Sequence, residues 1–164
     1  IEKLYEASQA GVKIELIVRG ICVLIPGIPG VSDNITVRSI VGRFLEHSRI
    51  FWFRNGGREE LYISSADWMP RNLNDRVELM VPIEDPEIKR RLKQMVDIEL
   101  SDNQKAHIMQ ADGTWLKTIS AENQLCAQEY FQKIAEKRDA EDEMTLAQKL
   151  EPYTPVLGHG DGSD

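Results

Sequence analysis

LEHSRIFWFRNGGREELYISSADW, residues 45–68, is the stretch that decides how this sequence folds. It places His47 directly before an apolar run over 49–54 that has the length and composition of a β-strand. A turn over 55–57, Asn-Gly-Gly, leads into a second strand that ends in Ser-Ser-Ala-Asp at 64–67. A histidine at the mouth of one strand and small hydroxyl residues at the end of its neighbour suit an anion. Phosphate chemistry is therefore the first hypothesis.

The segments before this stretch indicate an α/β fold. Apolar spacing over 1–9 predicts a helix, and β-branched residues over 12–18 predict a strand. The segment 21–34 is rich in Gly and Pro but also apolar, so we expect a loop that packs against the domain. Residues 35–40 predict another strand. A helix followed so closely by a strand favours layered α/β architecture with a mainly parallel sheet.

The remaining elements follow from turn and cap residues. Asp85 has the position of an N-cap and Pro86 that of the first helical residue. From residue 139 to 164 the chain becomes acidic and then Gly-rich, so we expect a domain over 1–138 and a flexible tail. The other predicted elements are one or two helical turns over 41–46, a loop over 69–74, a strand over 76–83, a helix over 87–100, a hairpin turn at 112–113 and a helix over 122–137.

Composition narrows the class of protein. The 164 residues suffice for one domain with a core, and a net charge of −7 argues against nonspecific nucleic-acid binding. Cys22 and Cys126 are far apart and form no zinc motif, so we expect reduced, buried thiols. No apolar run is long enough to span a membrane and no signal peptide is present, which favours the cytoplasm. The chain opens inside a helical pattern without Met, so we expect a fragment of a longer protein.

Four side chains are candidates for phosphate chemistry: His47, Arg19, Arg71 and Arg76. Histidine can accept a phosphoryl group or shuttle a proton near neutral pH. Arg19 directly follows a buried β-run, where open α/β sheets place ligands, and its fork matches phosphate oxygens. Arg71 and Arg76 follow the Ser-Ser-Ala-Asp end, and either could reach the same mouth. The alternative for each is a structural role, as a capping histidine, a salt-bridge partner or a solvated charge.

Other conspicuous residues are assigned to structure or solvent. His107 lies near a predicted exposed hairpin and His159 in the tail, and neither has the context of His47. The sequence PGIPG over 26–30 is neither a P-loop nor a dinucleotide-binding turn, so no nucleotide motif is indicated.

Three blocks of the chain together resemble one family. They are IELIVRGICVLIPGIPGVSDNI over 14–35, SIVGRFLEHSRIFWFRNG over 39–56 and YISSADWMPRNLNDRVE over 62–78. In this order they resemble the C-terminal region of bacterial polyphosphate kinase, across about 1–132. The resemblance implies an α/β phospholipase D-like half-domain, a mixed sheet flanked by helices, as the second of two similar halves.

The resemblance also implies an activity and its partners. It implies reversible transfer of the terminal phosphate of ATP to polyphosphate, through a phosphohistidine held in a preceding domain that is absent here. His47 matches the family's second active-site histidine, Arg19 matches a phosphate-binding arginine, and Arg76 is favoured over Arg71 as a further one. Magnesium is implied as cofactor with ligands outside this chain, so no metal ligand is assigned here.

The same resemblance sets the expected setting of the chain. The partners are ATP or ADP, polyphosphate and the preceding domains of the same protein, and a homo-oligomer stays open. Neither nucleic acid nor a membrane span is expected. The location is cytoplasmic, with membrane association of the full enzyme left open. The fragment alone is expected to be inactive because it lacks the nucleophile.

Two other function classes remain open. A phospholipase D-like phosphodiesterase or nuclease would need a His-x-Lys motif, but Arg49 stands at the lysine position, Asn55 near the acidic position, and 64–67 in place of the terminal element. A noncatalytic module would use the apolar face of the helix over 125–134 to bind a partner. Convergence of Arg19, His47 and Arg71 or Arg76 on one pocket would favour the kinase.

Overall fold

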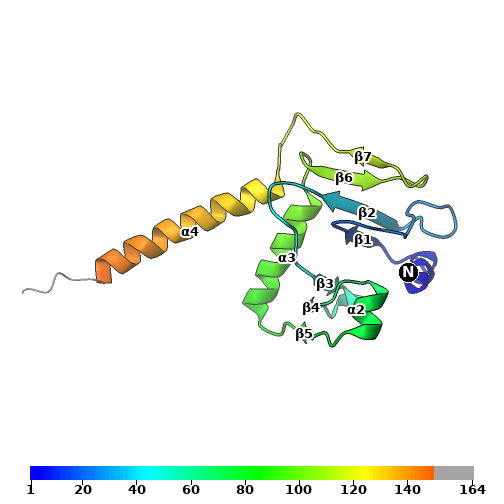
Figure 1. Ribbon diagram of the computed structural model, residues 1–164, viewed down its shortest axis with the longest axis horizontal. Helices are drawn as coiled ribbons and strands as arrows, with labels where there is room; N and C mark the ends of the chain where they lie inside the picture. Colours follow the sequence, from blue (N-terminus) through cyan, green and yellow to red (C-terminus); the bar gives the residue numbers. More distant parts are fainter. Residues whose placement is uncertain (150–164) are drawn as a thin grey trace, which may run out of the picture. The chain divides into compact units, whose positions relative to one another are not determined.

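The computed structural model describes the backbone of residues 1–149 and the side chains of residues 1–139. By compactness the chain divides into two units, Ile1–Gln128 and Glu129–Asp164. The α-helices and strands of the described part are α1 (Glu2–Gln9), β1 (Ile14–Ile17), β2 (Ile35–Ile40), β3 (Ile50–Phe53), β4 (Glu60–Ser64), α2 (Pro70–Asp75), β5 (Met80–Pro82), α3 (Pro86–Leu100), β6 (Ala106–Met109), β7 (Trp115–Lys117) and α4 (Ala127–Lys149). Figure 1 shows their arrangement.

A four-stranded mixed sheet carries the hydrophobic core. Its order is β1-β2-β6-β7, with β1 and β2 parallel and the other neighbours antiparallel. The prediction of a mixed sheet is confirmed, but the expectation of a mainly parallel sheet is wrong. The physical reason is the hairpin between β6 and β7, where Gly113 has φ +81° and the Gln110 amide donates to the Thr114 carbonyl at 2.8 Å. A tight turn of this kind joins only antiparallel strands.

A second sheet holds the stretch with which the sequence analysis began. Its three strands are antiparallel in the order β3-β4-β5, with Ile50 opposite Ile63 and Ile63 opposite Val81. The predicted Asn-Gly-Gly turn is confirmed, with positive φ at all of 55–57 and the Gly57 amide bonded to the Arg54 carbonyl at 2.8 Å. Positive φ is a conformation that Gly and Asn adopt most easily, so these residue types are required here.

The core lies on the four-stranded sheet and includes the Gly- and Pro-rich loop. Leu24, Ile35, Val37 and Met109 are its buried centre. The loop over 21–34 packs down through Leu24, and buried Ser32 closes it by donating to the Ile25 carbonyl at 2.8 Å. The predicted packing of this loop is therefore confirmed at its centre, although Ile21 and Val23 at its start are exposed.

Two local predictions, for segments 41–46 and 69–74, are wrong. Residues 41–46 are not helical, because the side chain of Gln128 bonds both the amide and the carbonyl of Phe44, at 3.0 and 2.8 Å, and so replaces local helical bonds. Residues 69–74 are not a loop, since α2 starts at Pro70. The Met69 carbonyl accepts from the amides of Asn72 and Leu73 at 3.0 and 3.1 Å. A proline at the first helical position is compatible with this start.

The long helices differ in how well their starts were predicted. The start of α3 is confirmed, because the Asp85 carboxylate accepts from the amides of Glu87 and Ile88 at 2.9 Å. α4 begins five residues later than residue 122, because the buried Asp102 carboxylate bonds the Ala127 amide at 2.8 Å. It continues to Lys149, past the predicted boundary at residue 138, and 150–164 of the predicted tail lie outside the described residues.

Two smaller expectations concern the thiols and the membrane. Cys22 and Cys126 are free but only half-buried, so their predicted full burial is wrong. Within residues 1–149, no helix combines the length and the apolar composition that crossing a membrane requires.

Candidate functional site

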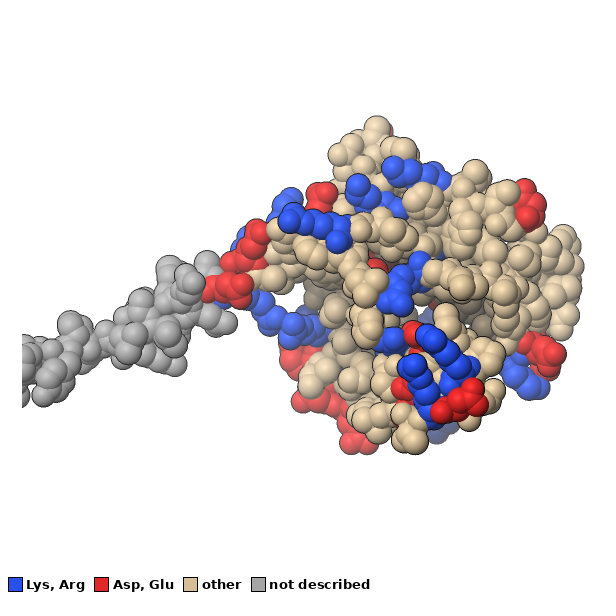
Figure 2. All heavy atoms as spheres, in the orientation of Figure 1, with Lys and Arg blue, Asp and Glu red and all other residues tan. Residues whose placement is uncertain are grey.

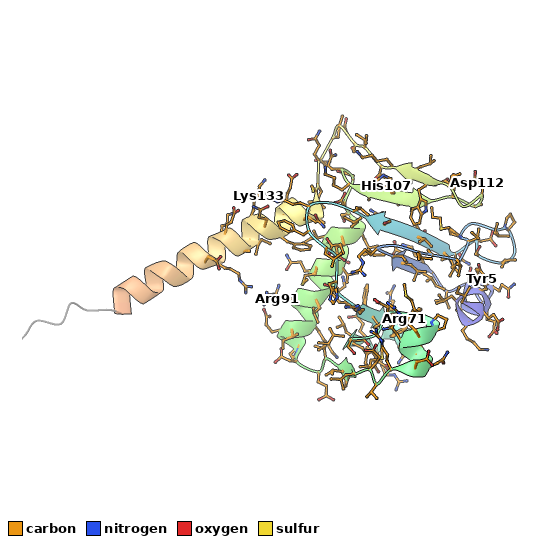
Figure 3. All side chains as sticks on the ribbon, viewed as in Figure 1. Tyr5, Arg71, Arg91, His107, Asp112 and Lys133 are labelled. Carbon is orange, nitrogen blue, oxygen red and sulfur yellow. The ribbon has the colours of Figure 1, made fainter. Side chains whose placement is uncertain are left out.

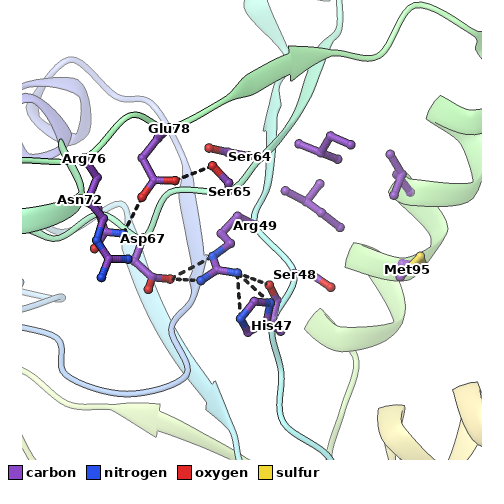
Figure 4. Close-up of a pocket in the computed structure, with 13 residues that line it drawn as sticks. His47, Ser48, Arg49, Ser64, Ser65, Asp67, Asn72, Arg76, Glu78 and Met95 are labelled. Atoms are coloured by element: carbon purple, nitrogen blue, oxygen red, sulfur yellow. Dashed lines mark hydrogen bonds and ion pairs between the residues drawn. The ribbon is translucent and has the colours of Figure 1, made fainter.

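A hollow of about 580 Å³ opens where β3 begins and β4 ends (Figure 4). We call it the β3–β4 hollow. Its apolar side comes from Ile50 and Ile63 of the sheet and from Leu92 and Met95 of α3. Its polar side is lined by His47, Ser48, Arg49, Ser64, Ser65, Asp67, Asn72, Arg76 and Glu78. The stretch 45–68 therefore builds most of a single concave site.

The antiparallel pairing explains why these residues meet. The Ser64 amide donates to the Arg49 carbonyl at 2.9 Å, so the start of β3 lies beside the end of β4. His47 precedes β3 and Asp67 follows β4, so both lie at the same end of this strand pair. In an antiparallel pair the start of one strand lies beside the end of the other, so side chains at these two places reach the same space.

Arg49 links His47 to Asp67. Its Nη1 lies 2.8 Å from His47 Nδ1 and donates to the His47 carbonyl at 2.8 Å. Its Nε and Nη2 both reach Asp67 Oδ1, at 3.0 and 2.9 Å. The Arg49 side chain is 16% exposed and that of Asp67 is 31% exposed, whereas His47 is exposed. A half-buried ion pair thus lies directly behind an open imidazole.

Glu78 is the centre of a second polar group. Its carboxylate accepts from the hydroxyl of Ser65 at 2.5 Å and from the amide group of Asn72 at 2.8 Å. These two hydrogen bonds, and then the charges of Arg76 and Arg49, hold the pKa of Glu78 below its ordinary value. Glu78 is therefore a carboxylate, and the β3–β4 hollow contains acids as well as bases.

Asn72 has an unusual position at the edge of the hollow. It is 3% exposed, and its Oδ1 finds no hydrogen-bond partner among the residues that the structure describes. Its amide nitrogen is already committed to Glu78, which settles the orientation of the amide group. An acceptor on the wall of the hollow is therefore left without a donor.

The predicted site residues only partly converge. His47 and Arg76 both line the β3–β4 hollow. Arg19 instead lines a separate hollow of about 260 Å³ with residues 40–46, although its Nη1 donates to the Glu46 carbonyl at 2.7 Å, one residue before His47. Arg71 is exposed on α2 (Figure 3) and lines neither hollow. His107 lies on β6 (Figure 3), away from the β3–β4 hollow as expected, and His159 lies outside the described residues.

Arg76 is the cation with free donors in the β3–β4 hollow. Its side chain makes no hydrogen bond or ion pair with any residue that the structure describes, whereas Arg49 is tied to Asp67. Lys and Arg lie among Asp and Glu on the visible face (Figure 2), so the surface there is not uniformly basic. Within the hollow, Arg76 is therefore the cation best placed to attract an anion.

Sequence reasoning missed the groups that hold the site together. Asn72 and Glu78 lie in segments interpreted as a loop and an alternating strand, and nothing in those patterns links them to Ser65. Arg49 was placed at a motif position, but its contacts were not predicted. Asp67 was noted at the end of the second predicted strand. Pairing the two predicted strands as a hairpin would have placed Asp67 near Arg49, so this contact could have been found from the sequence.

A buried acid lies close to the segment that leads into His47. Glu99 of α3 is 9% exposed, and burial first and the charge of Glu46 second raise its pKa to about 7. Glu46 itself accepts from the Gln128 amide group at 2.6 Å and, through its carbonyl, from Arg19. The segment before His47 is thus held by Gln128, at the start of α4, and by Arg19, which follows β1.

A metal site is not formed by the described residues alone. Within them, no three His, Cys, Asp or Glu side chains lie close enough to hold a metal ion together. Asp67 is tied to Arg49, and Glu78 to Ser65 and Asn72. The residues present therefore do not fit a magnesium site.

Comparison with known proteins gives one consistent match. Residues 1–128 match the family described as Polyphosphate kinase C-terminal domain 2. The polyphosphate kinase of Pseudomonas aeruginosa is 57% identical over 124 residues, which are 76% of this chain and 18% of that protein. The polyphosphate kinase of Synechocystis is 55% identical over 140 residues, which are 83% of this chain and 19% of that protein. The chain thus spans about a fifth of the length of these relatives.

A solved structure has the same fold. The crystal structure of polyphosphate kinase from Porphyromonas gingivalis superimposes with a TM-score of 0.78 at 43% sequence identity. The match covers 85% of this chain and 22% of that one. Both comparisons place the similarity in one part of a much longer protein.

Proposed function

Since this chain belongs to the Polyphosphate kinase C-terminal domain 2 family, we propose that it forms one wall of the active site of a polyphosphate kinase. The reaction is the reversible transfer of the terminal phosphate of ATP to inorganic polyphosphate. The domain is the second, phospholipase D-like half of the catalytic region. The partners of this wall are ATP or ADP, polyphosphate and the rest of the longer chain, in the cytoplasm.

The observation that carries the proposal is the meeting of His47 and Arg76 in the β3–β4 hollow. Phosphoryl transfer spreads negative charge over the oxygens of the moving group, so positioned cations and hydrogen-bond donors lower its barrier. Arg76 supplies a cation whose donors are not used by the described residues, and exposed His47 supplies a donor or acceptor on the wall of the same hollow. Arg19 donates to the carbonyl of Glu46, the residue before His47. It thereby extends the site toward the second hollow.

In the proposed reaction this chain does not carry the phosphate. A histidine of the preceding domain attacks the terminal phosphorus of ATP, a P–N bond forms and the P–O bond to ADP breaks. A terminal oxygen of polyphosphate then attacks that phosphorus, and the P–N bond breaks. His47 contacts the oxygens of the transferring group or hands a proton to the reaction centre, and Arg76 and Arg19 bind phosphates. Magnesium, when bound, neutralises phosphate charge, and its ligands lie outside this chain.

The competing functions have less support. A phosphodiesterase of the phospholipase D class needs a free lysine two residues after the histidine. Here Arg49 occupies that position and uses its donors on Asp67 and His47. A noncatalytic module gives no reason for His47 and Arg76 to share a concave site.

The test is His47→Ala in the full-length kinase that contains this domain. We expect ATP-dependent polyphosphate synthesis to fall by about two to four powers of ten, the usual effect of losing one acid–base or charge-stabilising group. His107→Ala is the matched control, because this histidine lies on β6 away from the hollow. Thermal unfolding of both variants verifies folding. Near-normal synthesis by a folded His47→Ala enzyme would refute the role.

A further inference from the structure

We propose that Gln128 is a positioning residue for the site, because its amide group holds the segment 42–46 that leads directly into His47. The consequence for catalysis rests on the proposed function, whereas the hold on the segment can be tested without it. Gln128 is 6% exposed and is the last residue of the compact unit that contains the β3–β4 hollow. It lies more than eighty residues after the segment that it contacts.

The segment 42–46 depends on side chains for its hydrogen bonds. Within the described part of the chain, its residues make no backbone-to-backbone hydrogen bond. The Phe44 amide donates to Gln128 Oε1 at 3.0 Å, and Gln128 Nε2 donates to the Phe44 carbonyl at 2.8 Å. The same nitrogen donates to Glu46 Oε1 at 2.6 Å. One side chain thus satisfies both backbone groups of Phe44, as a neighbouring strand would.

Gly42 leaves the space in which the Gln128 amide group lies. A Cβ added at Gly42 would overlap Gln128 Oε1 and lie 2.9 Å from its Cδ, whereas carbon atoms in contact are normally about 3.5–4.0 Å apart. The φ of Gly42 is not in the left-handed region, so the backbone would accept a Cβ, and the three atoms nearest to it all belong to Gln128. We call this pair of residues the Gly42–Gln128 latch.

Gln128 is itself fixed from the four-stranded sheet. The preceding amide, that of Ala127, donates to Asp102 Oδ2 at 2.8 Å. The other oxygen of this carboxylate accepts from the Ala106 amide at 3.0 Å, where β6 begins. Asp102 is 1% exposed, and Arg38 of β2 donates to its carbonyl at 2.9 Å. The packed sheet therefore sets the place of Gln128, and Gln128 sets the place of the segment.

The held segment touches two of the predicted phosphate-contacting residues. The Glu46 carbonyl accepts from Arg19 Nη1 at 2.7 Å, and His47 is the next residue along the chain. Movement of the segment would shift His47 relative to Arg76 on the wall of the hollow. Misplacing a reacting or stabilising group by about 1 Å costs roughly a hundredfold in rate. In the proposed reaction the latch therefore acts on catalysis through the residues that it positions.

The first arm of the test is hydrogen exchange at the Phe44 amide of the 164-residue chain, which needs no activity. Among residues 42–46, only this amide has an acceptor in the described part of the chain. Gln128→Ala removes the acceptor, and Gly42→Ala should displace it. We expect either change to speed exchange by about tenfold, the effect of losing one hydrogen bond. Unchanged exchange in Gln128→Ala would overturn the proposal.

A double-variant cycle tests whether Gly42 and Gln128 act through one contact. In the native background, Gly42→Ala should lower the urea midpoint of unfolding, because the Gln128 amide group must leave its bonds. In the Gln128→Ala background, the same change should leave the midpoint unaltered or slightly higher, since Ala restricts the unfolded chain. Equal losses in the two backgrounds would overturn the proposal.

The last arm measures kcat in the full-length kinase. We expect Gln128→Ala and Gly42→Ala each to lower kcat about 10- to 100-fold. Gln132→Ala, which truncates an exposed glutamine of α4, is the matched control and should leave kcat unchanged. In the His47→Ala background, Gln128→Ala should lower kcat by less than about threefold further, because the positioned residue is already absent.

The outcomes separate this proposal from the proposed function. If His47→Ala loses synthesis as expected, a normal kcat in a folded Gln128→Ala enzyme would overturn the positioning role. A full further loss in the His47→Ala background would do the same, since Gln128 would then act independently of His47. If His47→Ala keeps its activity, the proposed function fails, and hydrogen exchange at Phe44 still decides whether Gln128 holds the segment.

Discussion

The four-stranded sheet has a sealed interior, whereas the three-stranded sheet is open. Val37 and Ala106 of the first are 0% exposed. Phe53 and Met80 of the second are 47% and 49% exposed, and Leu61 at 3% is its buried exception. Stability and chemistry are thus divided between two sheets of one domain. The exposed three-stranded sheet leaves room for a polar hollow. The four-stranded sheet buries the apolar side chains that stabilise the domain.

The largest expected effect tests this division by a matched pair of truncations. Ile35→Ala removes a side chain that is 4% exposed in the core, and we expect it to lower the free energy of unfolding by about 2–5 kcal/mol. Ile63→Ala removes the same atoms from a side chain that is 39% exposed beside the hollow, and should cost about 1 kcal/mol. Urea unfolding of both variants measures the difference. Equal costs would show that the second sheet is as tightly packed as the first.

A second prediction uses α3, which connects the two sheets. Glu99 has a pKa raised from 4.5 to about 7 in the folded protein, chiefly by burial. The folded state therefore holds this proton more tightly than the unfolded chain. The resulting stabilisation is complete below about pH 4.5, declines between the two values, and is lost above about pH 7. Its size is on the order of 3 kcal/mol.

Glu99→Gln checks this pH dependence. Glutamine imitates the protonated acid but does not titrate, so the variant should lose less stability than the native chain between about pH 5 and pH 8. The measurement is the midpoint and slope of urea unfolding at both pH values, with Glu122→Gln, an exposed acid, as the control. Parallel pH profiles for the native chain and Glu99→Gln would contradict the assignment.

The smallest expected effect separates two arginines of the open region. Arg76 lines the β3–β4 hollow and Arg71 lies outside it on α2. In the full-length kinase, Arg76→Ala should raise KM for polyphosphate about tenfold, the effect of losing one charge-assisted contact of roughly 1.5 kcal/mol. Arg71→Ala should leave KM within about twofold. A larger rise in KM for Arg71→Ala than for Arg76→Ala would show that Arg71, not Arg76, binds the phosphate.

Local patterns were sufficient for elements whose bonds are local. The turn over 55–57 and the start of α3 at Asp85 were predicted because neighbouring residues supply their hydrogen bonds. His47 and Arg76 line one hollow, but the predicted convergence with Arg19 is not seen, because Arg19 lines a separate hollow. Segment 41–46 was predicted wrongly because its bonds come from Gln128, more than eighty residues away. A window of neighbouring residues cannot contain such a partner.

The division between the two sheets has the same origin. The sequence by itself determined the hairpin of β3 and β4, the histidine at its mouth and the family to which the domain belongs, because turn chemistry and motif order are local. Only the tertiary structure decided that β6 returns antiparallel to β2, that Arg19 and Arg71 lie outside the β3–β4 hollow, and that Arg49 faces inward to Asp67. These depend on which distant side chains meet, and that is settled by packing and by the pairing of buried charges.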